Sequence, residues 1–348
     1  SSQDPTTPIA DINVTGQYET HYITNISDDN IFFSDTLKFS YDTDFDRKHQ
    51  VIRIPNYNDV TVSGTITCSD WDGSTGGVII LRILGTLLIN YPDGAISADG
   101  KGYRGGIGTG SWNSPGTDGE GFLGNGDGDD NGGSGGEIHG GGGGATAVGN
   151  NELEKIYFGG GGGSSGGQDC NGTCFSDGGD GGGIIMIYAY NFINLGDIVS
   201  TGLAGGCAYW SSSGSGDAIP GGGSGAGGSI LLSFNYYDSS QMIEALSSEP
   251  CGTPEGGEYG TIGSVGNIRV NRPSDEYTVY TDPEAYYGLI VYGCTDPGAF
   301  NYDPGAMSND GSCIYGGCTD PNACNYDPDA DVDDGSCMYG EYCYGCTD

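Results

Sequence analysis

The sequence predicts an all-β fold in three parts: an N-terminal β region, a glycine-rich, parallel β-helix-like body, and a C-terminal array of small disulfide-stapled repeats. First, a sequence unit rich in Cys and Asp occurs twice near the C-terminus, and the first residues of a third copy follow. Repetition at a fixed period indicates an array of repeated structural units. Second, intensely apolar runs are separated by glycines, of which there are 70 among 348 residues. Third, acidic residues outnumber basic ones by 47 to 10, with Asp, a turn former, in the majority.

Residues 1–67 are the predicted N-terminal β-rich segment. Short apolar or alternating runs, such as 30–33 and 60–67, are bounded by Asp and Asn. Such runs are typical of strands joined by turns. We expect the first 40 residues either to fold back as a cap or to pair as a donated strand with another copy of the chain.

Residues 68–272 are the predicted β-helical body. Its apolar runs are continuous rather than alternating, which favours strands covered on both faces; they lie at 77–84, 183–190, 229–234 and 267–270. The first two runs are each followed by an Asn corner, a short segment between glycines (94–100 and 196–202) and a Gly-Gly pair. One coil of a stacked β architecture would have this pattern. The tracts 140–144 and 159–163 are expected to be loops between coils, or close-packed extended polyglycine.

The predicted repeat array covers residues 294–348. Gly293–Cys313 and Gly317–Cys337 are the two copies, and Gly345 opens a third, so we expect further copies in the natural polypeptide. Residues 273–293 are predicted to be a linker or a degenerate repeat, because 280–287 keeps the Thr-Asp-Pro pattern without cysteines.

The spacing of the cysteines predicts that each repeat closes on itself. Each expected pair is separated by 19 positions: Cys294 with Cys313, Cys318 with Cys337, and Cys324 with Cys343. Each such closure contributes about 3 kcal/mol to a unit with hardly any core. Cys170 and Cys174 are expected to form a local bridge, whereas the partners of Cys68, Cys207, Cys251 and Cys346 stay open.

Five carboxylates within nine residues make the second repeat a candidate calcium site. They are Asp327, Asp329, Asp331, Asp333 and Asp334, and the first copy keeps only Asp303 and Asp310 of this set. No basic residue lies between 294 and 348, and Ca²⁺ takes six to eight oxygen ligands in flexible geometry. The alternative is a solvated acidic turn that the disulfides hold alone.

Compartment and partners follow from composition. Twelve cysteines and three N-x-[ST] sequons, at Asn13, Asn25 and Asn171, favour a secreted or cell-surface glycoprotein. A net formal charge of −37 repels nucleic acid and anionic membranes. No apolar run is long enough for membrane insertion.

The body and the repeats each resemble segments of known proteins. The body, on 94–106, 182–206, 221–230 and 266–270, resembles the glycine-rich β-helical segments of large secreted and surface proteins of aquatic microbes. The C-terminal units look like the Cys-Thr-Asp-Pro…Asn-Tyr-Asp-Pro…Asp-Gly-Ser-Cys repeats of such proteins and are similar to the calcium-wrapped type 3 repeats of thrombospondins. These resemblances imply a surface location and no defined activity.

The sequence therefore predicts a non-enzymatic structural subunit of an extracellular fibre, appendage or coat that associates with itself. An adhesin or carbohydrate-binding protein is the alternative, because exposed Tyr side chains stack on sugars or pack between subunits. A polysaccharide-active enzyme would need paired carboxylates, for which Asp99, Asp129, Asp130 and Glu137 are the candidates. The G-x-G-x-x-G match at 100–105 is not followed by a predicted helix, so it indicates no dinucleotide site.

Overall fold

The protein is all-β in the part of the chain that the structure describes. The computed structural model describes residues 16–21, 23–33, 36–41, 49–108, 116–121, 124–125, 145, 147, 149, 153, 155–165, 176–207, 209–210, 218–219, 221–249, 251, 260–274, 277–294, 296, 298–303, 306 and 308–340. Within these ranges there is no α-helix, and most strand pairs are parallel. The described residues divide into two compact units, one up to Tyr18 and from Tyr41 to Leu289, the other from Glu19 to Ser40 and from Ile290 onward.

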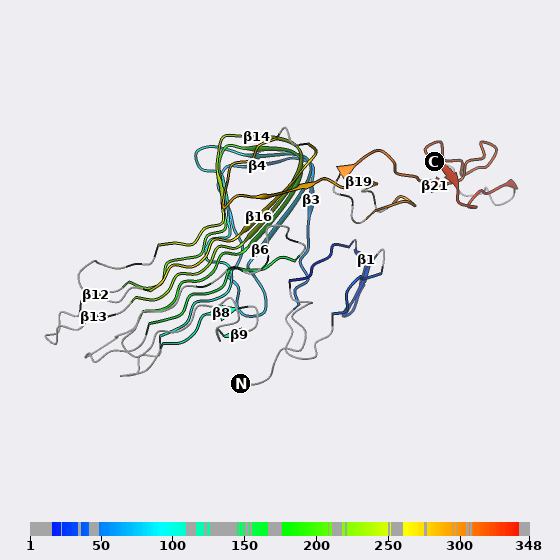
Figure 1. Cartoon of the computed structure of the whole chain (residues 1–348). Coiled ribbons are helices and arrows are strands. Elements are labelled where there is room, and N and C mark those ends of the chain that lie inside the picture. The colour runs from blue at the N-terminus through cyan, green and yellow to red at the C-terminus, as the bar shows by residue number, and fades with distance from the viewer. Residues whose placement is uncertain are drawn as a thin grey trace. The chain divides into compact units, whose positions relative to one another are not determined.

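Three strands of 11 or 12 residues and four shorter ones form a parallel sheet of seven members in the first unit (Figure 1). They are β3 (Asn56–Tyr57), β4 (Val60–Val62), β6 (Val78–Ile89), β10 (Ile184–Asn194), β14 (Ser229–Ser239), β16 (Asn267–Arg272) and β18 (Tyr286–Leu289). The order across the sheet is β18-β16-β14-β10-β6-β3, and β4 also pairs with β6. The four predicted apolar runs are therefore strands β6, β10, β14 and β16.

Short strands form a second parallel sheet of five members. They are β5 (Thr65–Ile66), β7 (Ala95–Ser97), β11 (Asp197–Val199), β15 (Ile243–Glu244) and β17 (Thr281–Asp282). The order β17-β15-β11-β7-β5 follows that of the first sheet, since each strand of the second sheet comes directly after a strand of the first in the chain. The two corner segments that share a sequence pattern lie side by side, with Ala95 paired to Asp197.

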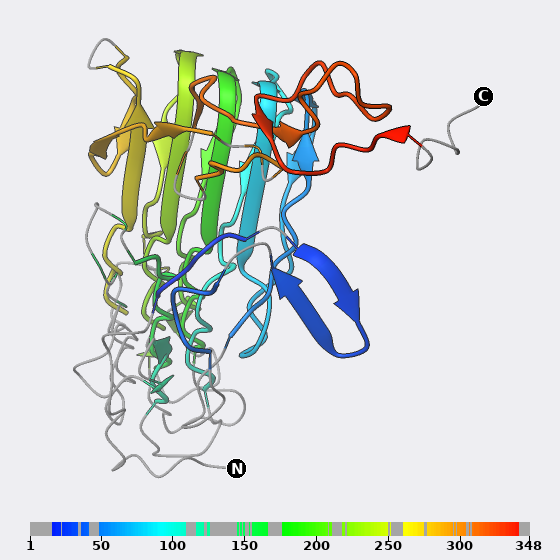
Figure 2. The same ribbon diagram turned by 90° about the vertical axis from the view of Figure 1, so that its right-hand side faces the viewer.

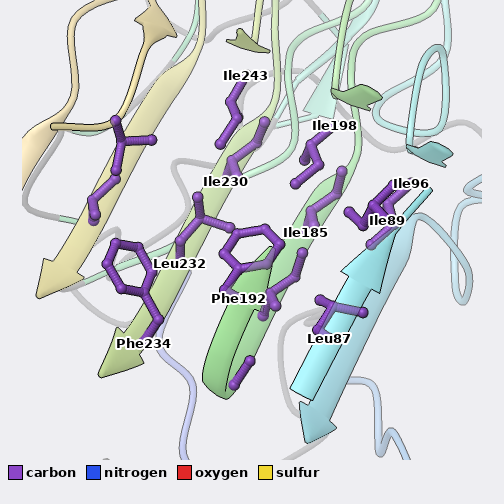
Figure 3. Close-up of a cluster of buried hydrophobic side chains, with 14 of the residues drawn as sticks. Leu87, Ile89, Ile96, Ile185, Phe192, Ile198, Ile230, Leu232, Phe234 and Ile243 are labelled. Atoms are coloured by element: carbon purple, nitrogen blue, oxygen red, sulfur yellow. The ribbon is translucent and has the colours of Figure 1, made fainter. Parts of the chain in front are cut away.

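The main hydrophobic core lies between these two sheets. Figure 3 shows Ile96, Ile198 and Ile243 of the short strands next to side chains of the long strands such as Ile185 and Ile230. A second cluster covers the opposite face of β10 and β14, where Trp71, Leu153, Ile156 and Phe158 pack against Ile184, Met186 and Leu231. The first halves of β10 and β14 are therefore buried on both faces, which explains their continuous apolar sequence.

Outside the two parallel sheets, extended glycine-rich segments pack against one another in what we call the glycine array. Its members are 102–106, 159–165, 178–183, 202–206, 221–228 and 260–266, and they run side by side in Figure 1. Within 178–183, residues 178 and 181 donate backbone hydrogen bonds to 102–106, whereas residues 179 and 182 donate to 221–228. This period of three matches the polyproline II helix, which has three residues per turn and no internal hydrogen bonds.

Close packing, rather than backbone conformation, requires glycine in this array. A Cβ on Gly178 would lie 1.8 Å from the carbonyl oxygen of Gly162, and a Cβ on Gly161 would lie 1.9 Å from that of Arg104. Described glycines with positive φ lie outside the array. In 260–266, only every third residue (260, 263 and 266) is glycine, and each of these faces the segment 221–228. The tract 159–163 thus belongs to an ordered array; the tract 140–144 lies outside the described residues.

The structure divides the chain differently from the predicted boundaries. Strands β17 and β18 pair with β15 and β16, so residues 277–289 complete the body instead of forming a linker or degenerate repeat. Strands β3, β4 and β5 pair with β6 and β7, so the body also begins before residue 68. Short strands of two to four residues carry too little periodicity to be assigned from sequence.

Three small antiparallel pairs lie outside the two parallel sheets. They are β1 (Ile23–Ser27) with β2 (Asn30–Phe33), β8 (Glu120–Gly121) with β9 (Gly124–Asn125), and β12 (Tyr209–Trp210) with β13 (Ala218–Ile219). Within the N-terminal region, β1 and β2 thus pair with each other. A disulfide between Cys207 and Cys251 connects the segments that follow β11 and β15.

Candidate functional site

The two described repeats share one small architecture. In the first, β19 (Tyr292–Gly293) pairs in parallel with β20 (Ser308–Asn309), and in the second, β21 (Gly316–Gly317) pairs with β22 (Val332–Asp333). The predicted disulfides Cys294–Cys313 and Cys318–Cys337 are present, each with a Cα–Cα distance of 4.7 Å. Each unit is therefore closed on itself, as the cysteine spacing predicted.

An asparagine side chain holds the last turn of each repeat. The Asn325 amide donates to the carbonyl oxygen of Ser336 and accepts from the Met338 N–H, both at 2.8 Å. Asn301 makes the equivalent pair with Ser312 and Ile314. The same bonds recur 24 positions apart, so the Asn that both copies share has a structural task.

The Asp-Gly-Ser sequence of each repeat forms a turn that its own side chains cap. Asp310 accepts from the Ser312 N–H at 2.9 Å, and Asp334 accepts from the Ser336 N–H at 2.8 Å. The glycine between them has a φ of 79° in the first repeat and 78° in the second. Asp is favoured in such turns because its short side chain reaches backbone N–H groups two residues later, and glycine because it adopts positive φ without strain.

A tyrosine that follows each repeat bonds back to an aspartate at its start. The Tyr315 hydroxyl donates to Asp296 at 2.8 Å, and the Tyr339 hydroxyl donates to Asp320 at 2.7 Å. The Tyr339 hydrogen bond, followed by that from the Asn322 N–H, lowers the pKa of Asp320. The same bond raises the pKa of Tyr339.

The junction between the repeats is also hydrogen-bonded. The Tyr315 N–H donates to the Asp331 carboxylate at 2.9 Å, and the Tyr315 carbonyl oxygen accepts from the N–H groups of Asp331 at 2.9 Å and Val332 at 3.1 Å. Tyr315 therefore contacts the first repeat through its hydroxyl and the second through its backbone. Asp331, one of the predicted calcium ligands, serves this junction.

Two of the other predicted ligands cap turns. Asp327 accepts from the Asp329 N–H at 3.0 Å, and Asp333 accepts from the Gly335 N–H at 2.9 Å. The Asp303 N–H donates to the carbonyl oxygen of Cys294 at 2.9 Å. Over the described ranges, no group of three His, Cys, Asp or Glu side chains is placed to hold a metal ion. The carboxylates thus do not converge, and calcium remains a prediction from the sequence.

The remaining cysteines divide into several cases. Cys324 is disulfide-bonded, and its predicted partner Cys343 lies outside the described residues, as do Cys170, Cys174 and Cys346. Cys207 pairs with Cys251, which the sequence left open. Cys68 is a half-buried thiol without a disulfide, and burial raises its pKa.

The other candidate residues are placed as follows. Asn25 is exposed on β1, whereas the sequons at Asn13 and Asn171 lie outside the described residues. Asp99 accepts from the Thr201 N–H at 2.7 Å and from the Ser97 hydroxyl at 3.1 Å, so it links the segments that follow β7 and β11. Asp129, Asp130 and Glu137 also lie outside the described residues. The structural tasks of Asn325 and Tyr339 were missed, although their recurrence in both copies was a usable signal.

Comparison with known proteins gives no relative. No protein-family model matches the chain, and neither a curated protein nor a solved structure matches it. No helix in the described residues is long and apolar enough to cross a membrane.

Proposed function

We propose that this chain is a structural subunit of an extracellular fibre, appendage or surface coat, and that it associates with copies of itself. One observation carries the proposal: the same repeat is built twice, with the same disulfide and the same hydrogen bonds at Asn301 and Asn325. Each unit is closed by its own disulfide, and the second unit repeats the hydrogen bonds of the first. Units of this kind suit a spacer, because the number of copies then sets its length.

We interpret the first unit as a glycine-rich β-helix-like body. Long strands, corners and short strands stack in the same order in both parallel sheets, as successive coils would. The end strands β3 and β18 pair on one side only in the described sheet. Such strands offer backbone groups to another chain, which supports self-association.

An extracellular location is part of this proposal. Disulfides persist in oxidising compartments, and the described residues hold three complete ones. Asn25 is exposed and therefore accessible to glycosylation. Peptide mapping of native material should find a glycan on Asn25; an unmodified Asn25 in secreted protein would remove this support.

Negative-stain microscopy of native material tests the structural role directly. The proposal expects long regular filaments or sheets, and isolated particles at all concentrations would reject it. Deletion of residues 1–40 then locates the contact: if the N-terminal region donates a strand, filaments disappear while circular dichroism still reports a folded body. Normal assembly of the deletion variant would place the contact elsewhere, for example at the edge strands.

Calcium stabilisation of the second repeat is a separate part of the proposal, which rests on the five clustered aspartates of 327–334. Calorimetry on the oxidised chain should show calcium binding that Asp329→Asn and Asp333→Asn weaken. Asp303→Asn in the poorer first repeat is the control and should have a smaller effect. Absence of heat, together with unchanged proteolysis of the repeats, would reject calcium binding and leave the disulfide-closed turns as the whole explanation.

A further inference from the structure

Strands β10 and β14 each turn two consecutive residues away from the main core at the same level. Ala189 and Phe192 both belong to that core, so Tyr190 and Asn191 lie between two inward side chains. Because side chains of a strand alternate between faces, a pair of residues between two inward ones marks a bend with both on the outer face. On β14, Asn235 and Tyr236 occupy the same position between Phe234 and Tyr237.

Strand register brings these outward residues together. Asn191 pairs with Thr86 of β6 on one side and with Tyr236 of β14 on the other. Its amide donates to the Thr86 hydroxyl at 3.2 Å. Leu84 precedes Thr86 and follows the buried Ile83, so it also lies on the outer face. Figure 2 shows these three strands side by side, in cyan, green and yellow-green.

The outward side chains are open to solvent. Leu84 is 56% exposed, Tyr190 54% and Tyr236 46%. The first halves of the same strands are different, because Trp71, Leu153, Ile156 and Phe158 cover that part of the outer face. The chain thus fills one half of this face with its own residues and leaves the other half as an aromatic stripe.

We propose that this stripe, made of Leu84, Thr86, Tyr190, Asn191 and Tyr236, binds a neutral saccharide chain that lies across the strands. Tyrosine rings offer flat apolar surfaces for the C–H faces of sugar rings, and their hydroxyls bond to water or to sugar hydroxyls at the rim. The Asn191 amide and the Thr86 hydroxyl supply polar groups between the rings. This binding goes beyond the structural role proposed above, which needs no ligand.

Charge and size select this occupant. The stripe has no charged member in a chain of net charge −37, so an anionic polymer would be repelled by the protein. A carboxylate at its edge, that of Asp59, already accepts from the Thr86 N–H at 2.7 Å, so a cationic polymer would find a single, hydrogen-bonded partner there. A stable protein–protein interface uses roughly 20–30 residues on each side, many more than these five. A thin, uncharged ligand with flat faces therefore fits better than a second copy of the chain.

Native affinity electrophoresis of the full chain tests the proposal, with a soluble β-glucan, mannan or galactan in the gel and a sulfated galactan as the charged probe. At least one neutral polysaccharide should retard the protein. The double variant Tyr190→Ala, Tyr236→Ala should weaken binding by about tenfold or more, and each single variant by about threefold. The double variant Tyr190→Phe, Tyr236→Phe should retain most of the binding, since the rings remain.

Tyr280→Ala is the matched control, because Tyr280 is also 56% exposed but lies outside the stripe; it should bind like the unaltered protein. Thermal melts by circular dichroism identify any variant that fails to fold. If the double alanine variant does not fold, the binding of the two single variants tests the proposal instead. Retardation by none of the neutral polysaccharides, or equal retardation of the double alanine variant, would overturn the proposal. So would loss of self-association in that variant, because the stripe would then be a contact between copies.

Discussion

The glycine array and the repeats provide hydrogen-bond partners for their backbone groups in different ways. In the array, N–H groups donate to carbonyl oxygens of neighbouring segments, and glycine occupies the positions that leave no space for a Cβ. In the repeats, Asn and Asp side chains bond to the backbone of their own turn. The array therefore depends on neighbours far away in the sequence, whereas a repeat depends on residues within one disulfide-closed loop.

The two regions also differ in what is buried. The core between the sheets of the body includes large side chains such as Phe192 and Phe234, with ring centroids 6.1 Å apart. From residue 294 onward, the buried apolar side chains among the described residues are those of Cys294, Ala299, Cys318 and Ala323. A unit without a sizeable core needs covalent closure. We therefore expect added side chains to destabilise the array, and removal of disulfides or of side-chain hydrogen bonds to destabilise the repeats.

The largest expected effect comes from adding one methyl group to the array. In Gly178→Ala, the new Cβ would lie 1.8 Å from a backbone oxygen of 159–165, so two bonded segments must separate. We expect a loss of about 3 kcal/mol or more in the free energy of unfolding of the body, measured by denaturant titration. Gly64→Ala is the control, since no atom lies within 4 Å of its Cβ position. Equal stability of the two variants would mean that the array is not close-packed.

A smaller effect is expected from opening one repeat. The double variant Cys318→Ser, Cys337→Ser removes a loop closure worth about 3 kcal/mol in the unfolded ensemble, and this loss should stay within the second repeat. Limited proteolysis with mass spectrometry should show new cleavage sites between 318 and 337 and none between 178 and 234. Protection of the opened repeat would show that its turns suffice without the disulfide.

The smallest effect concerns the hydrogen bond between Tyr339 and Asp320. Because the folded-state pKa of Asp320 is lowered, its stabilising contribution is present above the unfolded value of about 3.9 and is lost as pH falls through the folded value. The pKa of Tyr339 is raised, so its contribution is lost as pH rises through that higher value. In Tyr339→Phe, an NMR titration should find the Asp320 pKa closer to its ordinary value and that of Asp296 unchanged. A shift at both carboxylates would indicate a general unfolding.

Sequence patterns predicted the strands and the local disulfides because both are short-range signals. The runs at 183–190 and 229–234 are continuously apolar because these strands are buried on two faces, and this pattern is visible within eight residues. The Cys318–Cys337 disulfide is visible as a fixed spacing within one repeat. The Cys207–Cys251 disulfide could not be predicted in this way, since it depends on the pairing of β11 with β15, which brings together residues 44 positions apart. The array carried a signal that was not used: inner segments such as 159–163 are glycine throughout, whereas the segment 260–266 has glycine at every third position.

The candidate metal site shows a sequence pattern that has two uses. A cluster of five aspartates predicts a cation, yet in the structure Asp327, Asp333 and Asp334 each accept a hydrogen bond from a backbone N–H two residues later. Asp has both uses, and composition alone does not separate them. The regular Asp-Gly-Ser sequence of both copies predicts the capped turn, because it specifies an Asp cap with glycine at positive φ; whether the same carboxylates also bind calcium is the prediction that calorimetry tests.

Hydrogen–deuterium exchange of the full chain, before and after reduction of its disulfides, tests the contrast between the two regions most directly. The amides of 178–183 and 221–228 should exchange slowly in both states, because each array segment is bonded to several neighbours. The amides of 296–338 should lose their protection on reduction. Fast exchange of 178–183 and 221–228 in the oxidised protein would contradict the account, since polyglycine without these bonds is an unstructured chain.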